Sequence, residues 1–120
     1  MRTFRTKESE SKYQKYIENG GLLNGCALCR ANSIKEFDHW RIIANDFPYD
    51  EIAETHDMVV LKRHASDTEI NEEERLELDI LKDSYIKEHY KYILEPTKGG
   101  KTIPGHLHLH LLVGHSKFEK

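Results

Sequence analysis

The sequence predicts an α+β domain in which one long helix packs on an antiparallel β-sheet, with a shorter helix at the N-terminus. A length of 120 residues suits a single domain with one core. Three runs of strand-like composition lie at 39–44, 57–63 and 106–113, and apolar residues recur at helical spacing over 71–94. The short connections between the middle strands permit hairpins and leave no space for parallel crossovers. We therefore expect one domain over residues 1–120, with 1–7 as a frayed, solvated tail.

The first half of the chain predicts a helix, a turn-rich segment and a strand. Residues 8–19 place Tyr13, Tyr16 and Ile17 on one helical face, and two glycines at 20 and 21 end the helix. Residues 22–30 form a turn-rich segment that contains both cysteines. The strand at 39–44 ends at a loop, 45–50, which contains Pro48.

The second half predicts a strand, the long helix and a last strand. The β-branched, apolar run at 57–63 leads directly to His64. Asn71 is suited to cap the helix 71–94, because three glutamates follow it in the first turn, where the helix dipole favours negative charge. Pro96 ends this helix, and a glycine-rich segment, 97–105, leads to the final strand.

Composition and charge exclude several classes of function. Hydrophobic residues make up 38% and charged residues 32% of the chain, which is typical of globular proteins. No window reaches membrane-spanning length, and the first ten residues contain no apolar run, so we expect a cytoplasmic protein without a membrane partner. A net charge of -3 gives no support to a broad nucleic-acid surface. Any phosphate that the protein binds is expected to belong to a small molecule.

The most informative segment is the last strand, where His106, His108 and His110 alternate with leucines. Alternate side chains of a strand point to opposite faces, so the three imidazoles share one face and the leucines point into the core. A half-exposed structural strand is the alternative, but other polar residues would solvate such a face without groups that titrate near neutral pH. His106 and His110 lie about 13 Å apart along an extended strand, too far to bind one metal ion. The three histidines should therefore have different roles.

Cys26 and Cys29 form a C-x2-C pair, which suits two ligands of one zinc ion or a redox-active pair. A thioredoxin-like redox pair normally follows a strand and opens a helix, whereas this pair follows a helix and precedes a strand. A zinc site would need two more ligands, which must come from the eight histidines. If His64, at a strand exit, and His106 complete the set, four protein ligands make the metal structural.

These motifs together resemble the histidine-triad (HIT) family, in particular its small zinc-containing bacterial or phage-type members. The resemblance depends on the cysteine pair, the Asn-Asp-Phe-Pro-Tyr loop from 45 to 49, the run that ends in Lys-Arg-His at 64, and the alternating segment 106–113. It spans about residues 25–114. It implies a nucleotide-binding α+β fold, commonly a homodimer, that acts at the α-phosphorus of nucleoside phosphoesters, phosphoanhydrides or phosphoramidates.

The resemblance also implies roles for individual residues. His108 corresponds to the nucleophile, which forms a nucleotidyl-histidine intermediate, and His110 to the residue that contacts the phosphate or the leaving group. The zinc ligands of the family correspond to four residues of this sequence, namely Cys26, Cys29, His64 and His106.

Physical chemistry is consistent with these roles. A neutral imidazole is a good nucleophile, and its second nitrogen should donate to a backbone carbonyl. A second imidazole, partly protonated near neutral pH, can donate to a phosphate oxygen or to the leaving group.

Substrate binding is expected from the loop after the first strand and from the segment before the triad. Asn45 either accepts the ribose hydroxyls, as the resemblance implies, or simply begins a loop. Many hydrolytic members have Gly-Gln-Ser before the triad, whereas this chain has Gly-Lys-Thr-Ile-Pro-Gly at 100–105. Ile103 cannot donate a hydrogen bond, so Lys101 and Thr102 are the candidate donors.

Three interpretations of function follow. The first is a zinc-stabilised HIT-type nucleotide hydrolase or nucleotidyltransferase. The second is a nucleotide-binding module that has lost fast chemistry, to which the isoleucine at 103 gives weight. The third is a small zinc-stabilised interaction protein. The remaining histidines, at 39, 56, 89 and 115, are expected to be structural or solvated.

Overall fold

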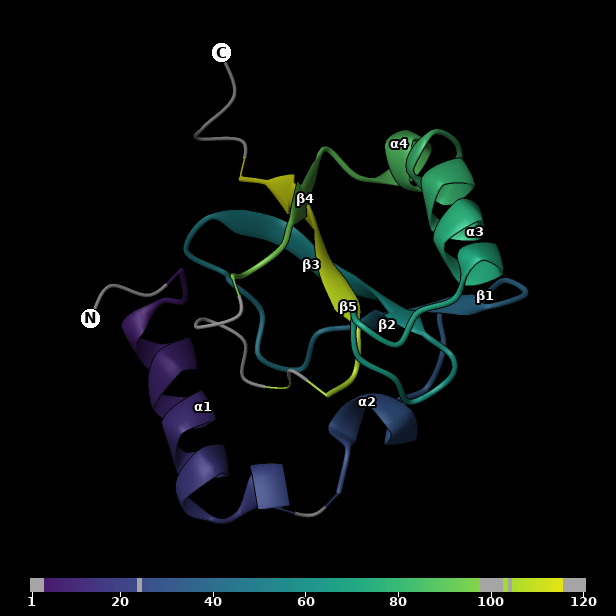
Figure 1. The fold of residues 1–120 in the computed structure, drawn as a ribbon. Coiled ribbons are helices and arrows are strands. Elements are labelled where there is room, and N and C mark those ends of the chain that lie inside the picture. Colours follow the sequence, from purple (N-terminus) through teal and green to yellow (C-terminus); the bar gives the residue numbers. More distant parts are fainter. Residues whose placement is uncertain (1–3, 24, 98–102, 104, 116–120) are drawn as a thin grey trace.

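The computed structural model describes residues 4–23, 25–97, 103 and 105–115. The strands of this part of the chain form one sheet in the order β1-β2-β3-β5-β4, and every neighbouring pair is antiparallel (Figure 1). The predicted α+β class is confirmed. The elements in chain order are α1 (Lys7–Glu18), η1 (Gly21–Leu23), α2 (Ala27–Arg30), β1 (Lys35–Glu36), β2 (Trp40–Ala44), β3 (Ala53–Leu61), α3 (Glu72–Lys82), α4 (Tyr85–His89), β4 (Tyr92–Leu94) and β5 (His108–Gly114).

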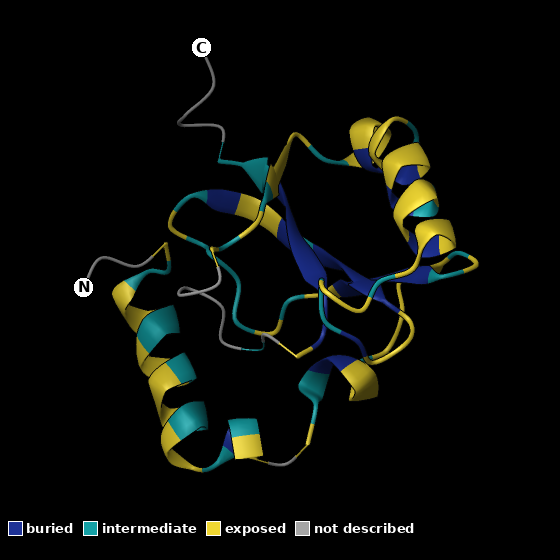
Figure 2. Cartoon of the chain, viewed as in Figure 1, coloured by how far each residue is buried: buried dark blue, intermediate teal, exposed yellow. Residues whose placement is uncertain are grey.

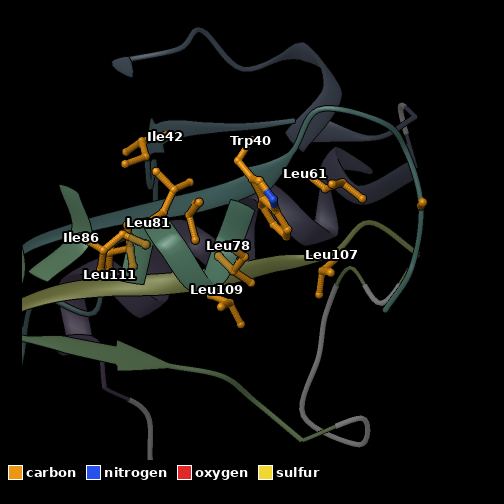
Figure 3. Packing of buried hydrophobic residues seen from close by; sticks show 11 residues of the cluster. Trp40, Ile42, Leu61, Leu78, Leu81, Ile86, Leu107, Leu109 and Leu111 are labelled. Carbon is orange, nitrogen blue, oxygen red and sulfur yellow. The ribbon is translucent and has the colours of Figure 1, made fainter. Parts of the chain in front are cut away.

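One face of the sheet, called the helix face here, packs against α3 and α4. Leu107, Leu109 and Leu111 point to this face, as the alternation predicts, and Figure 3 shows them in one cluster with side chains of α3. Trp40 is fully buried there, and its indole N–H donates to the backbone oxygen of Glu74 in α3 at 2.8 Å. The buried residues of this cluster are Trp40, Ile42, Val59, Leu61, Ala65, Leu78, Leu81, Ile86, Leu107, Leu109 and Leu111.

The opposite face, called the cavity face here, carries a smaller apolar cluster. Ile43, Met58 and Val60 point to this side of β2 and β3, and Leu28 of α2 packs on them. In the register of β3 with β5, Met58 is opposite His110 and Val60 is opposite His108. The cavity face therefore places apolar side chains beside the imidazoles of β5.

The predicted boundaries of the long helix are wrong. Helix α3 ends at Lys82, a second short helix covers 85–89, and residues 92–94 form strand β4 on the edge of the sheet. The hydroxyl of Ser84 donates to the backbone oxygen of Ile80 at 2.6 Å, and Ser84 has non-helical backbone angles. Serine competes with the helical backbone for hydrogen bonds, which explains the break there. Ile93, which fits the helical spacing, instead pairs with Leu111 of β5.

Two strand boundaries also differ from the prediction. Strand β3 begins at Ala53, before the predicted start at 57, and it includes His56. Strand β5 begins at His108, so His106 lies in a bend two residues before its start. The sequence does not predict β1, which has only two residues and is exposed. Polar, exposed edge strands of this length carry little hydrophobic pattern, so periodicity does not reveal them.

The N-terminal helix is confirmed over Lys7–Glu18, but the prediction of a frayed tail is wrong for residues 4–7. Thr6 caps the helix, since its hydroxyl accepts from the backbone N–H of Ser9 at 3.2 Å. Asp50 accepts from the backbone N–H of Thr6 at 2.9 Å and from the hydroxyl of Ser9. Residues 1–3 lie outside the described part. The segment is ordered because a carboxylate of a distant loop binds the start of the helix.

The start of α3 matches its prediction, because Asn71 and Glu74 form a capping box. Glu74 is only 3% exposed, and its carboxylate accepts from Nε and Nη2 of Arg63 at 3.1 and 2.8 Å. This ion pair holds the end of β3 against α3. Figure 2 shows that buried residues concentrate in the central strands, whereas α1 is exposed or half-buried along its length.

Candidate active site and metal site

The three histidines of the triad lie on the cavity side of the sheet. His106, His108 and His110 are 1%, 7% and 6% exposed, whereas the leucines between them belong to the core on the helix face. The predicted division of faces is therefore confirmed. The ring of His106 faces the two cysteines, whereas the rings of His108 and His110 line a cavity. The three imidazoles therefore have different surroundings, as the distance along the strand requires.

His108 has its tautomer fixed by the backbone. Its Nδ1 lies 2.8 Å from the backbone oxygen of His106, and a carbonyl oxygen only accepts, so Nδ1 carries the hydrogen. In the neutral ring Nε2 is then the nitrogen with a lone pair. This is the arrangement that a nucleophilic imidazole needs, and the predicted bond from the second nitrogen to a backbone carbonyl is confirmed.

His110 is part of a pair with His56 that sequence reasoning missed. His56 Nε2 lies 2.7 Å from His110 Nδ1, and the backbone N–H of Tyr49 donates to His56 Nδ1 at 2.9 Å. Since His56 Nδ1 accepts, neutral His56 carries its hydrogen on Nε2 and donates to His110. His110 is then the tautomer with its hydrogen on Nε2. A pattern of alternate residues at 56, 58 and 60 would have predicted His56 on this face if the strand had been extended upstream.

Both imidazoles of this pair are held neutral, which corrects the expectation of a partly protonated second histidine. Burial, followed by the nearby His56, His108 and Arg5, lowers the pKa of His110 to about 3. Burial, followed by the charge of Arg5, lowers the pKa of His56 to about 4. The aromatic ring of Tyr49 covers both, with ring centroids 4.4 Å from His56 and 5.1 Å from His110. Any hydrogen bond from His110 to an anion therefore starts from a neutral N–H.

Acidification is expected to destabilise the fold through this pair. Both folded pKa values lie below the ordinary 6.5, so their contribution to stability is present above that value and is lost as the pH falls towards 4. At pH 5 the loss is on the order of 2 kcal/mol for each histidine. Denaturant unfolding of the wild type and of His110→Asn at pH 7 and pH 5 measures it. The variant should lose clearly less stability than the wild type, and equal losses would contradict this explanation.

The cavity beside His108 and His110 is bounded by the loop after β2, by α1 and by α2. Asn45 lies at its edge, where its Oδ1 accepts from the backbone N–H of Phe47 at 2.8 Å. Asn45 therefore does begin the loop, as one of its two interpretations predicts, and it also faces the cavity. The lining residues are Arg5, Tyr13, Tyr16, Leu22, Ala27, Leu28, Ala31, Ile43, Ala44, Asn45, Asp46, Phe47, Tyr49, Met58, Ile103, His108 and His110.

The segment before the triad is described only in part. Ile103 lines the cavity and packs against the apolar cluster of the cavity face, beside Cys26 and Ala31. Lys101 and Thr102, the candidate donors, lie outside the described residues. Ile103 thus contributes an apolar wall where a polar residue is common in hydrolytic members of the family that the sequence resembles.

The second cluster consists of Cys26, Cys29, His64 and His106, whose ligand atoms all lie within 4.8 Å of one another. Both cysteines are free thiols. His106 Nδ1 is 3.3 Å from the sulfur of Cys26 and 3.4 Å from that of Cys29, and His64 Nδ1 is 3.3 Å from the Cys29 sulfur. Around a tetrahedral zinc ion, neighbouring ligand atoms are about 3.3–3.8 Å apart. The group can therefore hold a metal ion, and its spacing fits zinc.

The surroundings of this cluster orient its ligands. His106 Nε2 donates to the backbone oxygen of Leu61 at 2.6 Å, so Nδ1 is left as the nitrogen that faces the sulfurs. Arg41, which is 9% exposed, donates to the backbone oxygens of Leu28 and Ala31, at the end of helix α2. Helix α2, which begins after Cys26 and contains Cys29, is therefore fixed to β2. His106 connects the two sites, because its ring faces the cysteines and its carbonyl accepts from His108.

Solved structures share this fold. A HIT family hydrolase from Clostridium thermocellum is 24% identical over 81% of this chain and 96% of its own, with a TM-score of 0.54. A histidine triad protein from Clostridium difficile is 21% identical over the same shares, with a TM-score of 0.51. A protein described as HIT-like is 22% identical over 71% of this chain and 87% of its own, with a TM-score of 0.50. The chain therefore has the fold of histidine-triad proteins.

Other comparisons add nothing to this result. No family model matches the sequence, and no curated protein matches it. Among the described residues, no helix has the length and apolar character that crossing a membrane requires.

Proposed function

We propose that this chain, with its histidine-triad fold, is a HIT-type nucleotide hydrolase or nucleotidyltransferase. Its substrates are nucleoside phosphoesters, phosphoanhydrides or phosphoramidates, and the reaction takes place at the α-phosphorus. The observation that carries the proposal is the fixed tautomer of His108 in a cavity that it shares with His110.

The reaction begins with attack of His108 Nε2 on the α-phosphorus. A nitrogen–phosphorus bond forms, and the bond to the leaving group breaks and gives the leaving group its electron pair. Water or another acceptor then attacks phosphorus and loses its proton to solvent, while the nitrogen–phosphorus electron pair returns to Nε2. Covalent catalysis of this kind replaces one difficult displacement by two easier ones.

His110 contributes a hydrogen-bond donor rather than a charge. The chain of donors from the Tyr49 N–H to His56 and from His56 to His110 leaves the hydrogen of His110 on Nε2. A neutral N–H directed at the α-phosphate stabilises negative charge that develops on its oxygens. We assign substrate contacts also to Asn45, towards the ribose hydroxyls, and to Lys101 and Thr102, towards phosphate.

Zinc is the metal that we propose for Cys26, Cys29, His64 and His106. With four protein ligands the metal is structural, and when bound it supplies a rigid link between α2, the end of β3 and the start of β5. His106 is the residue that transmits this rigidity, since its carbonyl accepts from His108.

A trapped adduct tests the proposal. Incubating the protein with a panel of nucleoside phosphoramidates and dinucleoside polyphosphates, followed by rapid acid-free denaturation and intact-mass measurement, should show one added nucleoside monophosphate. Peptide mapping should place it on His108, and His108→Ala should acquire none. Nucleotide binding by calorimetry without adduct or turnover would instead favour a binding module, and zinc without nucleotide affinity would favour an interaction protein.

We also propose a cytoplasmic homodimer, as the resemblance implies. Strand β4 is the edge of the sheet, and Tyr92 and Ile93 on it are 64% and 41% exposed. An exposed edge with large apolar side chains is suited to pair with a second copy. The single chain has a mass of 14.1 kDa, and sedimentation at micromolar concentration should give twice this mass. The variant Ile93→Glu should sediment as a monomer. A monomer in the wild type would exclude the dimer.

A further inference from the structure

The N-terminal residues 4–6 are bound to the loop between β2 and β3 by a hydrogen bond from each. The backbone oxygen of Phe4 accepts from the N–H of Glu51 at 2.9 Å, and the N–H of Thr6 donates to Asp50 at 2.9 Å. Between them, Nε of Arg5 donates to the backbone oxygen of Phe47 at 2.7 Å. The position of the Arg5 side chain is therefore set by contacts on both sides of it.

Arg5 lines the same cavity as His108 and His110. Its guanidinium carbon lies 4.1 Å from the ring centroid of Tyr13 and 4.9 Å from that of Tyr49, which in turn covers His110. Its side chain is 13% exposed. Stacking of this kind orients the planar guanidinium.

Arg5 places a positive charge at the wall of the cavity, which Asp46 also lines. The positive charge of Arg5 helps to keep the neighbouring imidazoles neutral, since it contributes to the lowered pKa of His56 and of His110. Its carboxylate partner is Glu10, whose Oε1 lies 3.3 Å from Nη1. Because the guanidinium binds phosphate through parallel N–H bonds, a phosphate group can compete with this contact.

We propose that Arg5 binds a second anionic group of the substrate, next to the phosphate that faces His108 and His110. The inference rests on the proposed function and specifies its substrate class: nucleotides with a phosphoanhydride are preferred over nucleotides with a neutral amine leaving group. Arg5 is thus a specificity-determining residue contributed by the segment that precedes the cysteine pair.

Binding of two nucleotides that differ by one phosphate tests this. Calorimetry measures the affinity for a nucleoside α,β-methylene diphosphate, which resists cleavage, and for the monophosphate of the same base. The difference between the two affinities reports the contribution of the second phosphate. In Arg5→Gln we expect the diphosphate analogue to bind at least about tenfold more weakly, as loss of a charge-assisted contact implies, and the monophosphate to change by less than about threefold. Arg5→Lys should lie between Arg5→Gln and the wild type.

Glu10→Gln separates an anion site from a merely structural contact. If Arg5 binds the substrate, removing the competing carboxylate should tighten the diphosphate analogue by about threefold or more. If Arg5 only fixes the N-terminal segment, Glu10→Gln should weaken both ligands or leave both unchanged. Lys15→Gln removes a positive charge from the exposed side of α1 and should change neither affinity. Thermal unfolding of each variant checks that the fold is retained.

The possible failures differ in what they show. If both nucleotides bind and the His108 adduct forms, but Arg5→Gln changes the two affinities by the same factor, the role of Arg5 is overturned and the proposed function stands. If the wild type binds neither nucleotide and forms no adduct, the proposed function fails and this inference fails with it.

Discussion

Replacing His108 with alanine is expected to lower the turnover of any nucleotide substrate by at least about 10³-fold, because the proposed covalent step loses its proposed nucleophile. The backbone oxygen of His106 loses its donor in this variant, but the imidazole is 7% exposed and lies in the cavity rather than in the apolar core. The fold should therefore survive. Steady-state kinetics on the best substrate of the panel, with thermal unfolding alongside, measure the effect.

Two further variants test the role of His110 and provide a control for the effect of His108→Ala. His110→Asn keeps a hydrogen-bond donor of smaller reach and should lower turnover by about 10²-fold while the adduct on His108 still forms. His89→Gln, at an exposed position of helix α4, serves as a histidine control and should leave turnover unchanged. Wild-type turnover in His108→Ala would remove the nucleophile from the proposal.

Removing the metal is expected to have the second largest effect. Zinc at about 1,000 times its dissociation constant stabilises a fold by about 4 kcal/mol, which for a chain of this size corresponds to roughly 10–20 °C in Tm. Chelation, or Cys29→Ser, should produce a loss of that order, and metal analysis should fall from one zinc per chain to less than one tenth. Activity should fall as well, since His106 is a proposed metal ligand and its backbone oxygen also fixes the tautomer of His108.

A comparison of variants identifies the ligands. Each single substitution among Cys26, Cys29, His64 and His106 should lower zinc content, whereas His39→Asn and His89→Gln should not. If the purified protein contains no zinc and its Tm does not rise when zinc is added, the four residues form no metal site. A Cys26–Cys29 disulfide under mild oxidation, with no effect of zinc, would favour the redox interpretation instead.

The sequence predicts the parts of the fold that have a strong period. Strand β5 follows from apolar residues at every second position, and the buried strands β2 and β3 follow from short apolar runs. Helix α1 follows from its apolar face and the two glycines that end it, and the start of α3 follows from its Asn71 cap. The end of α3 is not predictable in this way, because Ile93 fits a helical spacing and a strand equally well. Pairing with β5 decides between them, and such tertiary contacts are invisible in local periodicity.

The sequence also predicts part of the candidate site and misses part of it. The four metal-site residues are brought together as expected, and the faces of His108 and His110 are correct. His56 and Arg5 are missed because each owes its position to contacts far along the chain, His56 with His110 and Arg5 with Phe47. A lone histidine or a basic residue near a chain end gives no local signal of such contacts.

Which face each side chain of β5 occupies depends on the number of residues between His106 and His110 more than on which residues they are. Leu109 lies between two imidazoles of the opposite side, so deleting it would shift every following residue to the other face and bring leucine into the cavity. A deletion or insertion of one residue between His106 and His110 should therefore be far more damaging than many substitutions there. Redesign of this segment can vary its side chains but has to preserve its register.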